Sequence, residues 1–276
     1  MDGPPERNLL DRLRLRPAIR WWALEQQGDL FAVAHKSSQP EDQIGDKRGT
    51  VKGFSRASRL RMLKTIARID WRKNRKALFV TLTYPDDYWS KDFGKRTQQR
   101  SQFVRDLENH VGRKLGILWR VEWKPRLSGP RLDTLAPHQH FVIFGAPWIQ
   151  MEWFNARWRG ILGYDGHVQT DVEVLRGAEA AAQYAAKYAA KDSLGGLDND
   201  AYLNTTCGRS WGVLRRLLVP WRPNRYLVSI PPEAVVMAQD FAAEITGKRY
   251  PGGFVLLHCE AERLFTKLVD TLRLGA

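Results

Sequence analysis

Two histidines near the middle of the chain have a spacing that suits metal binding. His138 and His140 lie in the run PHQHFVIFG, whose residues after the second histidine are mostly apolar. Side chains alternate along a strand, so both imidazoles would point to one face, ~7 Å apart along the backbone, while Gln139 points to the other. Such a pair can converge on one metal ion, with the apolar residues holding the strand rigid. Surface or packing histidines are the alternative explanation.

A carboxylate precedes this pair. Glu122 lies in the run WRVEW, between two apolar residues of a predicted strand. If that strand pairs with the histidine strand across the intervening loop, all three side chains can share a sheet face. Two imidazoles and one carboxylate leave coordination positions open, as a catalytic divalent metal requires. The alternative is an edge-strand glutamate paired with Arg120 or Lys124.

A third group supplies candidate nucleophiles. The run YAAKYAAKD places Tyr184 and Tyr188 four residues apart, with Lys187 and Lys191 at the same spacing. In a helix this spacing puts both tyrosines on one face, one turn apart, with the lysines stacked beside them. A tyrosine phenol needs help to act as a nucleophile, and a lysine or a metal supplies positive charge to the attacked group. Tyrosines packed against a sheet would explain the same pattern without catalysis.

The elements that position these groups follow from hydrophobic periodicity and turn residues. Strands alternate with helices, and this order predicts an α+β fold with a central antiparallel sheet and helices packed on it. The predicted strands are 30–34, 77–84, 116–123, 138–145, 167–174 and 227–230, and the predicted helices are 53–70, 96–115, 150–162, 178–191, 232–247 and 257–273.

Charge points to a polyanionic partner. The 276 residues carry 44 Lys and Arg against 30 Asp and Glu, a formal charge of +14. Nucleic acid is the commonest intracellular polyanion, although ribosome-associated and membrane-surface proteins share such a charge. One side of the helix predicted over 53–70 concentrates basic residues and is a candidate DNA contact, with a solvated basic face as the alternative: Arg56, Arg59, Arg61 and Lys64.

Composition excludes several other classes. The two cysteines belong to no CxxC pair, which argues against a disulfide framework or a structural zinc site and favours a reducing cytoplasm. The N-terminal segment is charged throughout, unlike a signal peptide, and no apolar run approaches the ~18 residues of a membrane helix. We therefore expect a cytoplasmic protein with no membrane partner.

Together these motifs resemble those of the HUH endonucleases, particularly the rolling-circle replication initiators of small phages and plasmids. LFVTLTYP at 78–85 is similar to the family's first motif, PHQHFVIFG at 137–145 to its paired-histidine motif, and YAAKYAAKD at 184–192 to its tyrosine motif. The resemblance extends over residues 45–215. It implies an HUH- or RRM-like sheet in an endonuclease domain at 51–215. Residues 1–50 would form an N-terminal extension, and residues 216–276 a helical extension packed on the same domain.

The resemblance also implies the roles of the metal-binding and catalytic residues. His138, His140 and Glu122 would ligate Mg²⁺ or Mn²⁺. Tyr188 would attack the scissile phosphate, giving a 5′-phosphotyrosine and a free 3′-OH, with Tyr184 as a second nucleophile. The flanking residues that position the phosphate or assist are Lys187, Lys191 and Asp192. Both tyrosines are followed by lysine at the third position, so the register of the motif is ambiguous.

The implied partners are single-stranded DNA at a replication origin, a host polymerase and a host helicase, because the chain has no GxxxxGK[ST] motif of its own. A relaxase or single-strand transposase of the same superfamily is one alternative. Another is a non-catalytic nucleic-acid-binding protein that uses its arginines and stacks bases on Trp21, Trp22 or Trp89. A zinc hydrolase is disfavoured because no HxHxD continuation follows His140.

Overall fold

The computed structural model describes residues 20–37, 56–71, 77–85, 93–125, 135–175 and 209–274. These residues belong to two compact units, each of which is described by itself. The central unit is residues 48–223, and the terminal unit joins residues 1–47 to residues 224–276. Each unit contains an antiparallel sheet with helices packed on it, so the predicted α+β class is confirmed.

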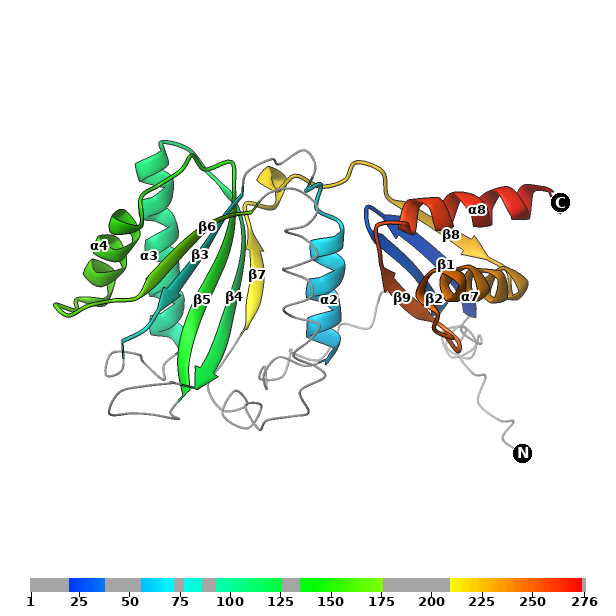
Figure 1. The fold of residues 1–276 in the computed structure, drawn as a ribbon, viewed down its shortest axis with the longest axis horizontal. Coiled ribbons are helices and arrows are strands. Elements are labelled where there is room, and N and C mark those ends of the chain that lie inside the picture. The colour runs from blue at the N-terminus through cyan, green and yellow to red at the C-terminus, as the bar shows by residue number, and fades with distance from the viewer. Residues whose placement is uncertain are drawn as a thin grey trace, which may run out of the picture. The chain divides into compact units, whose positions relative to one another are not determined.

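The sheet of the central unit has five antiparallel strands in the order β6-β3-β5-β4-β7. Figure 1 shows α3 and α4 on one side of this sheet and α2 on the other. The bounds of the elements are α2 Arg56–Ala67, β3 Ala77–Thr83, α3 Phe93–Val111, β4 Gly116–Pro125, β5 Leu135–Phe144, α4 Met151–Leu162, β6 Thr170–Leu175, β7 Trp211–Leu214 and the short 3-10 helix η2 Arg216–Leu218.

Both faces of this sheet are buried, which explains why its strands have long apolar runs. One face packs on α3 and α4 through a core that includes Phe103, Phe141 and Trp158, all fully buried. The other face packs on α2 through Met62 and Ile66. β5 lies in the middle of the sheet, so the strand with the two histidines is held by neighbours on both sides.

Local sequence signals set the ends of these elements. α4 ends at Gly163, whose φ of 61° is the left-handed conformation that glycine adopts without strain. On β7, Gly212 lies against the Trp119 indole, and an added Cβ would come within 2.9 Å of the ring nitrogen. A side chain at that position would therefore push β7 away from β4.

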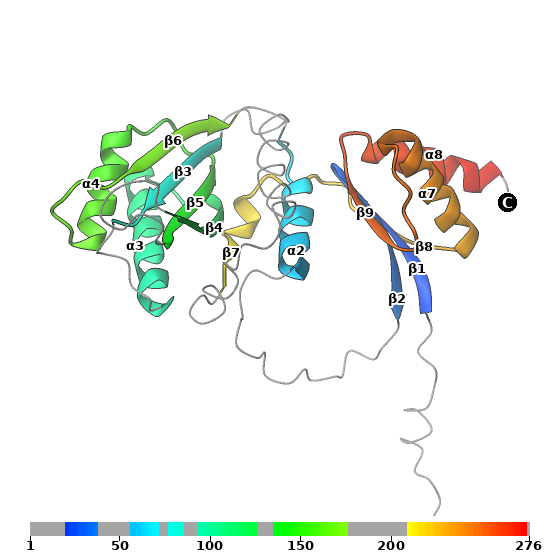
Figure 2. The same cartoon turned by 60° about the horizontal axis from the view of Figure 1, so that its bottom comes forward.

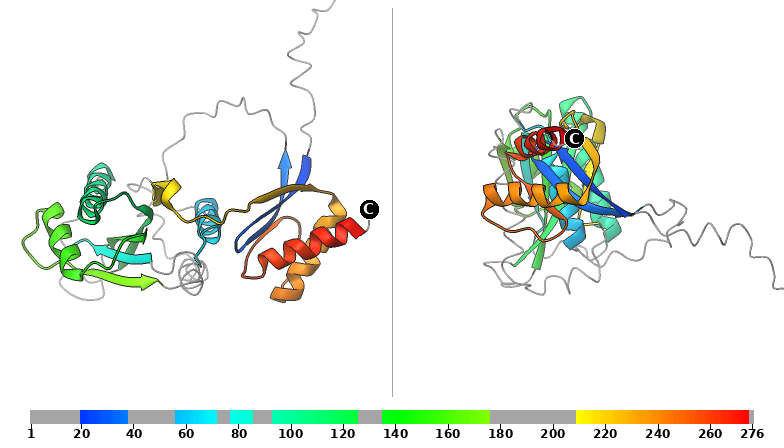
Figure 3. Two further views of the ribbon diagram at one scale, coloured as in Figure 1. Left: turned by 90° about the horizontal axis from the view of Figure 1, so that it is seen from above. Right: turned by 90° about the vertical axis from the view of Figure 1, so that its right-hand side faces the viewer.

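The terminal unit has a four-stranded antiparallel sheet in the order β8-β1-β2-β9. Its helices α7 and α8 both pack on one face of that sheet, and Figure 3 shows them close together. The bounds are β1 Arg20–Gln27, β2 Leu30–Ser37, β8 Tyr226–Ile230, α7 Pro232–Thr246, β9 Phe254–Leu257 and α8 Ala261–Leu274. Within the described ranges, none of the helices of either unit has the length and apolar character that a membrane crossing requires.

This unit differs from the expected division of the chain. We predicted separate extensions at 1–50 and 216–276, the second packed on the endonuclease domain. In the structure β1 pairs with β8 and β2 pairs with β9, so the two ends of the chain form one sheet. The helices bury their apolar sides against that sheet, in a core with Leu24, Phe31 and Leu264. Long-range strand pairing of this kind leaves no local signal in the sequence.

Candidate metal centre and nucleic-acid interface

The register of β4 and β5 brings the predicted carboxylate to the predicted histidines. Glu122 lies directly opposite His138, and Arg120 lies opposite His140. Residues paired in this way point to the same face of a sheet, so the shared face that we predicted is present. Gln139 points to the other face, where its side-chain amide donates to the Tyr84 hydroxyl at 2.7 Å.

The three side chains form a tight, mostly buried group. Nε2 of His140 lies 2.9 Å from Oε2 of Glu122, and the side chains of these residues are 1% and 3% exposed. The rings of His138 and His140 are nearly parallel, with centroids 6.3 Å apart, which agrees with the expected spacing. His138 is only half-buried. One imidazole therefore lies deep in the sheet face, and the other lies nearer to solvent.

Two threonines of β3 lie beside the histidines. Thr81 pairs in register with His140, and its hydroxyl is 3.0 Å from Nδ1 of that ring. Thr83 pairs with His138, and its hydroxyl is likewise 3.0 Å from Nδ1. Sequence analysis quoted these threonines only as part of a motif. The signal for their role was present, because the spacing of TLT is the same as that of HQH.

An aromatic ring and a cation complete this part of the face. The ring of Phe79 stacks on that of His140 at a centroid distance of 5.5 Å, with planes 9° apart. On the other side of His140, Arg120 is 8% exposed, which is low for an arginine. Stacking and register thus fix the buried histidine between an apolar ring and a guanidinium group.

The helix α2 covers a neighbouring part of the same face. Its Ser58 hydroxyl accepts a hydrogen bond of 2.9 Å from the Trp211 indole, and Trp211 lies opposite Arg120 in the sheet. Figure 2 shows α2 beside this sheet from a second direction. The basic helix that we predicted therefore lies close to the histidine strand within the central unit.

The orientation of α2 differs from the prediction, which placed Leu60 on the buried side. Leu60 is 39% exposed, whereas Met62, Ile66 and Ile69 are buried and meet the sheet at spacings of four and three residues. Methionine was left out of the predicted apolar side, and this omission rotated it. The adjacent Thr65 is also buried.

The basic residues of α2 differ in exposure. Arg61 is exposed, Arg59 and Lys64 are half-buried, and the side chain of Arg56 lies outside the described residues. Of the four predicted DNA contacts, Arg61 is therefore the one that the structure shows open to solvent. The structure brings the helix that carries them to the histidine face, but it does not test DNA contact.

The predicted nucleophiles fall in the range 176–208, which the structure does not describe. This range contains Tyr184, Lys187, Tyr188 and Lys191. Asp192 lies there too. Among the tryptophans proposed to stack on bases, Trp89 and the side chain of Trp21 are likewise outside the described residues, whereas Trp22 packs at the edge of the core of the terminal unit.

The donor atoms of this face suit a divalent cation. Imidazole nitrogens and a carboxylate oxygen are ligands of catalytic metals, and a hydroxyl beside the second ring nitrogen is the usual outer contact of a ligating histidine. The direct contact between Glu122 and His140 brings two of these donors within hydrogen-bonding distance. In the part of the chain that the structure describes, however, no three His, Cys, Asp or Glu side chains are already arranged around one point.

On the opposite face, a polar chain supports the same strand. The Tyr84 hydroxyl donates to Gln99 of α3 at 3.0 Å and accepts from Gln139 of β5. Burial raises the pKa of the Tyr84 phenol, so it stays neutral and is unsuited to nucleophilic attack. Tyr84 is therefore a structural tyrosine that ties the histidine strand to α3.

One family model matches part of the chain. Residues 77–193 match the family of replication-associated proteins described by the name ORF2. The match begins at β3 and contains Glu122, both histidines and the tyrosine motif. No curated protein and no solved structure matches the chain. The match covers less than half of the chain and associates this part of the central unit with replication.

Proposed function

We propose that the protein initiates rolling-circle replication by cutting one DNA strand and remaining bonded to it. The observation that carries this proposal is the placement of Glu122 opposite His138 and in contact with His140, on one face of the sheet that matches the replication-associated family. A buried carboxylate beside two histidines is costly in a plain sheet and is explained by cation binding.

The proposed reaction exchanges one phosphodiester bond for another. The hydroxyl oxygen of Tyr188 attacks the scissile phosphorus and loses its proton, and the bond from phosphorus to the 3′ oxygen breaks. The 3′ oxygen takes up a proton, which leaves a free 3′-OH for a polymerase and a 5′-phosphotyrosine on the protein. Tyr184 would attack in a second transfer that releases the product.

The other residues bind and orient the DNA. His138, His140 and Glu122 would hold Mg²⁺ or Mn²⁺, which withdraws charge from the phosphate when bound. Lys191, or Lys187 if Tyr184 attacks first, would place a positive charge beside the phosphate. Arg61 of α2 would contact the backbone of the approaching strand. A host helicase would separate the strands.

The direct test is a cleavage assay on single-stranded DNA that contains the cognate origin, with Mn²⁺ or Mg²⁺. We would compare the intact protein with Tyr188→Phe, Tyr184→Phe and the double variant. Tyr164→Phe is a matched control, because Tyr164 is a half-buried tyrosine of the central unit. We expect a metal-dependent covalent protein–DNA band that Tyr188→Phe abolishes and Tyr164→Phe leaves intact.

Other outcomes discriminate the alternatives. Loss of the band only in the double variant would show that either tyrosine can attack. Transfer that joins two cut ends without any replication initiation would favour a transposase or relaxase. If the cognate origin is bound but is neither cut nor linked with any divalent metal, the protein is a binder and the catalytic proposal is wrong.

A further inference from the structure

The two threonines of β3 match the two histidines of β5 one to one. Thr81 lies opposite His140 and Thr83 opposite His138, and both distances from hydroxyl oxygen to Nδ1 are 3.0 Å. A threonine side chain has few rotamers in a strand, because its β-branch restricts χ1. Each hydroxyl is therefore presented to its ring from a stiff backbone, at the same place on two successive rungs of the sheet.

This arrangement determines which ring nitrogen faces the carboxylate. In both histidines Nδ1 is directed at a hydroxyl of β3, and in His140 Nε2 is directed at Glu122 of β4. A threonine hydroxyl can accept a hydrogen bond from Nδ1–H, and a neutral ring protonated at Nδ1 has its lone pair on Nε2. A cation can bind only to a nitrogen that carries a lone pair.

We propose that Thr81 and Thr83 are positioning residues, which hold His140 and His138 with Nδ1 protonated and Nε2 available to a cation. The inference rests on the proposed metal-dependent function, which it deepens by assigning the outer contacts of the site. Thr81 acts on the buried ring, where water cannot replace the lost hydrogen bond. Its removal therefore has the larger effect of the two.

The test uses the near-isosteric variants Thr81→Val and Thr83→Val, which remove only the hydroxyl. Thr81→Ser and Thr83→Ser restore the hydroxyl. Thr170→Val is the matched control, since Thr170 is a buried threonine of β6 whose hydroxyl donates to Asn155 on the opposite face of the same sheet. Binding of Mn²⁺ to the full chain is titrated by electron paramagnetic resonance, and ring tautomers are read from ¹⁵N chemical shifts of the metal-free protein.

We expect each valine variant to lose Mn²⁺ affinity by roughly tenfold to a hundredfold, with the greater loss at Thr81. Serine should recover most of the affinity, and Thr170→Val should bind Mn²⁺ as the intact protein does. In the ¹⁵N spectra, Thr83→Val should move the neutral His138 ring from the Nδ1–H form towards the Nε2–H form. Equal Mn²⁺ affinity and unchanged tautomers in the valine variants would overturn the inference.

The two readouts keep this inference separate from the proposed function. If the intact protein binds no Mn²⁺ and cuts no DNA, the proposed function fails, while the tautomer of the His138 ring still tests the role of Thr83. If the valine variants lose affinity but serine does not restore it, the threonines act only as packing residues and the positioning role is wrong.

Discussion

The two units of this molecule have similar architecture and opposite electrostatic character. Each has an antiparallel sheet with two helices on one face, α3 and α4 in the central unit and α7 and α8 in the terminal unit. The terminal unit has 13 Lys and Arg against 14 Asp and Glu, a net charge of −1, whereas the central unit has 31 against 16, a net charge of +15. The two values add to the +14 of the whole chain.

The comparison teaches where DNA recognition can lie. A polyanion is attracted by the unit that carries the excess of positive charge, and here that unit also contains the histidine face and the family match. The terminal unit cannot contribute by net charge, so any role it has in replication must depend on shape or on specific contacts. Four predictions, in order of decreasing effect, test this division.

The largest effect is expected from the histidine face. His138→Ala should lower the cleavage rate by ~10³-fold, about 4 kcal/mol, because it removes a cation ligand without opening the core. His35→Ala is the matched change in the terminal unit, where His35 is exposed and packs against the edge of Trp22. Single-turnover cleavage rates should fall only for His138→Ala. An equal loss in both variants would break the comparison.

The next effect concerns the separate cores. Leu264→Ala removes a buried side chain from the core of the terminal unit and should destabilise that unit by ~3 kcal/mol. Hydrogen exchange should accelerate in β1, β2 and α8 and stay unchanged in β5. Leu107→Ala, which opens the core beneath α3, should give the reverse pattern. Acceleration in both units with either variant would show that they unfold as one.

A smaller effect is expected at Glu108, a buried carboxylate of the central unit that accepts from Lys114, Arg215 and the Leu115 N–H. Burial alone would raise the pKa of this carboxyl, but the hydrogen bonds and the Arg215 charge outweigh burial and lower it. Glu108→Gln should cost about 2 kcal/mol at neutral pH, measured by urea denaturation.

The pH dependence of this variant follows from the sign of the shift. A carboxyl with a lowered pKa in the folded state stabilises the fold above its unfolded pKa, near 4.5, and loses that contribution as pH falls through the folded value. The intact protein should therefore lose more stability below pH 4.5 than Glu108→Gln. Glu25→Gln, which removes an exposed pair with Arg225 in the terminal unit, should cost under ~1 kcal/mol.

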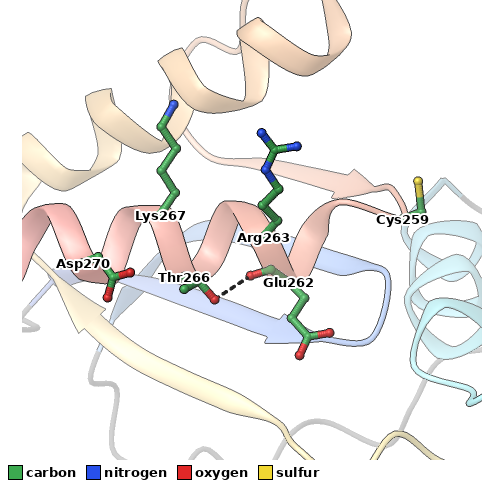
Figure 4. Close-up of a pocket in the computed structure, with 6 residues that line it drawn as sticks. All are labelled: Cys259, Glu262, Arg263, Thr266, Lys267 and Asp270. Atoms are coloured by element: carbon green, nitrogen blue, oxygen red, sulfur yellow. Dashed lines mark hydrogen bonds between the residues drawn. The ribbon is translucent and has the colours of Figure 1, made fainter.

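The smallest effect is on the salt dependence of DNA binding. Replacing Arg61 and Lys64 of α2 by glutamine should reduce the slope of log affinity against log salt by about 1, at ~0.7 per lost phosphate contact on single strands. The matched pair is Arg263 and Lys267, two exposed residues four apart on α8, which Figure 4 shows along the outside of that helix. Their replacement should leave the slope unchanged, and an equal reduction would place DNA on both units.

The strands and helices around the histidines could be predicted because they carry clear local signals. β3, β4, β5, α3 and α4 begin and end within a few residues of their predicted bounds. The opposition of Glu122 and His138 was expected on the condition that β4 and β5 pair, and they do. The alternation of a strand was enough to separate Gln139 from its neighbours.

Other features could not be predicted, for identifiable reasons. β7 and β9 have four residues each, too few to show a period. β1 contains Leu24, Glu25 and Gln26, which favour helices as much as strands, and its strand character depends on pairing with β2 and β8. The contact of each threonine with a histidine requires the register of β3 and β5, which depends on chain segments far apart in sequence.

The central claim is that the central unit bonds covalently to the DNA that it cuts. The most direct measurement is to react the intact protein with its origin DNA and Mn²⁺, digest the covalent complex, and identify by mass spectrometry the peptide that carries the nucleotide. We predict a 5′-phosphate linked to Tyr188, with Tyr184 labelled only after a second transfer. A nucleotide on any residue of the terminal unit, or cleavage that proceeds with no linkage at all, would contradict this account.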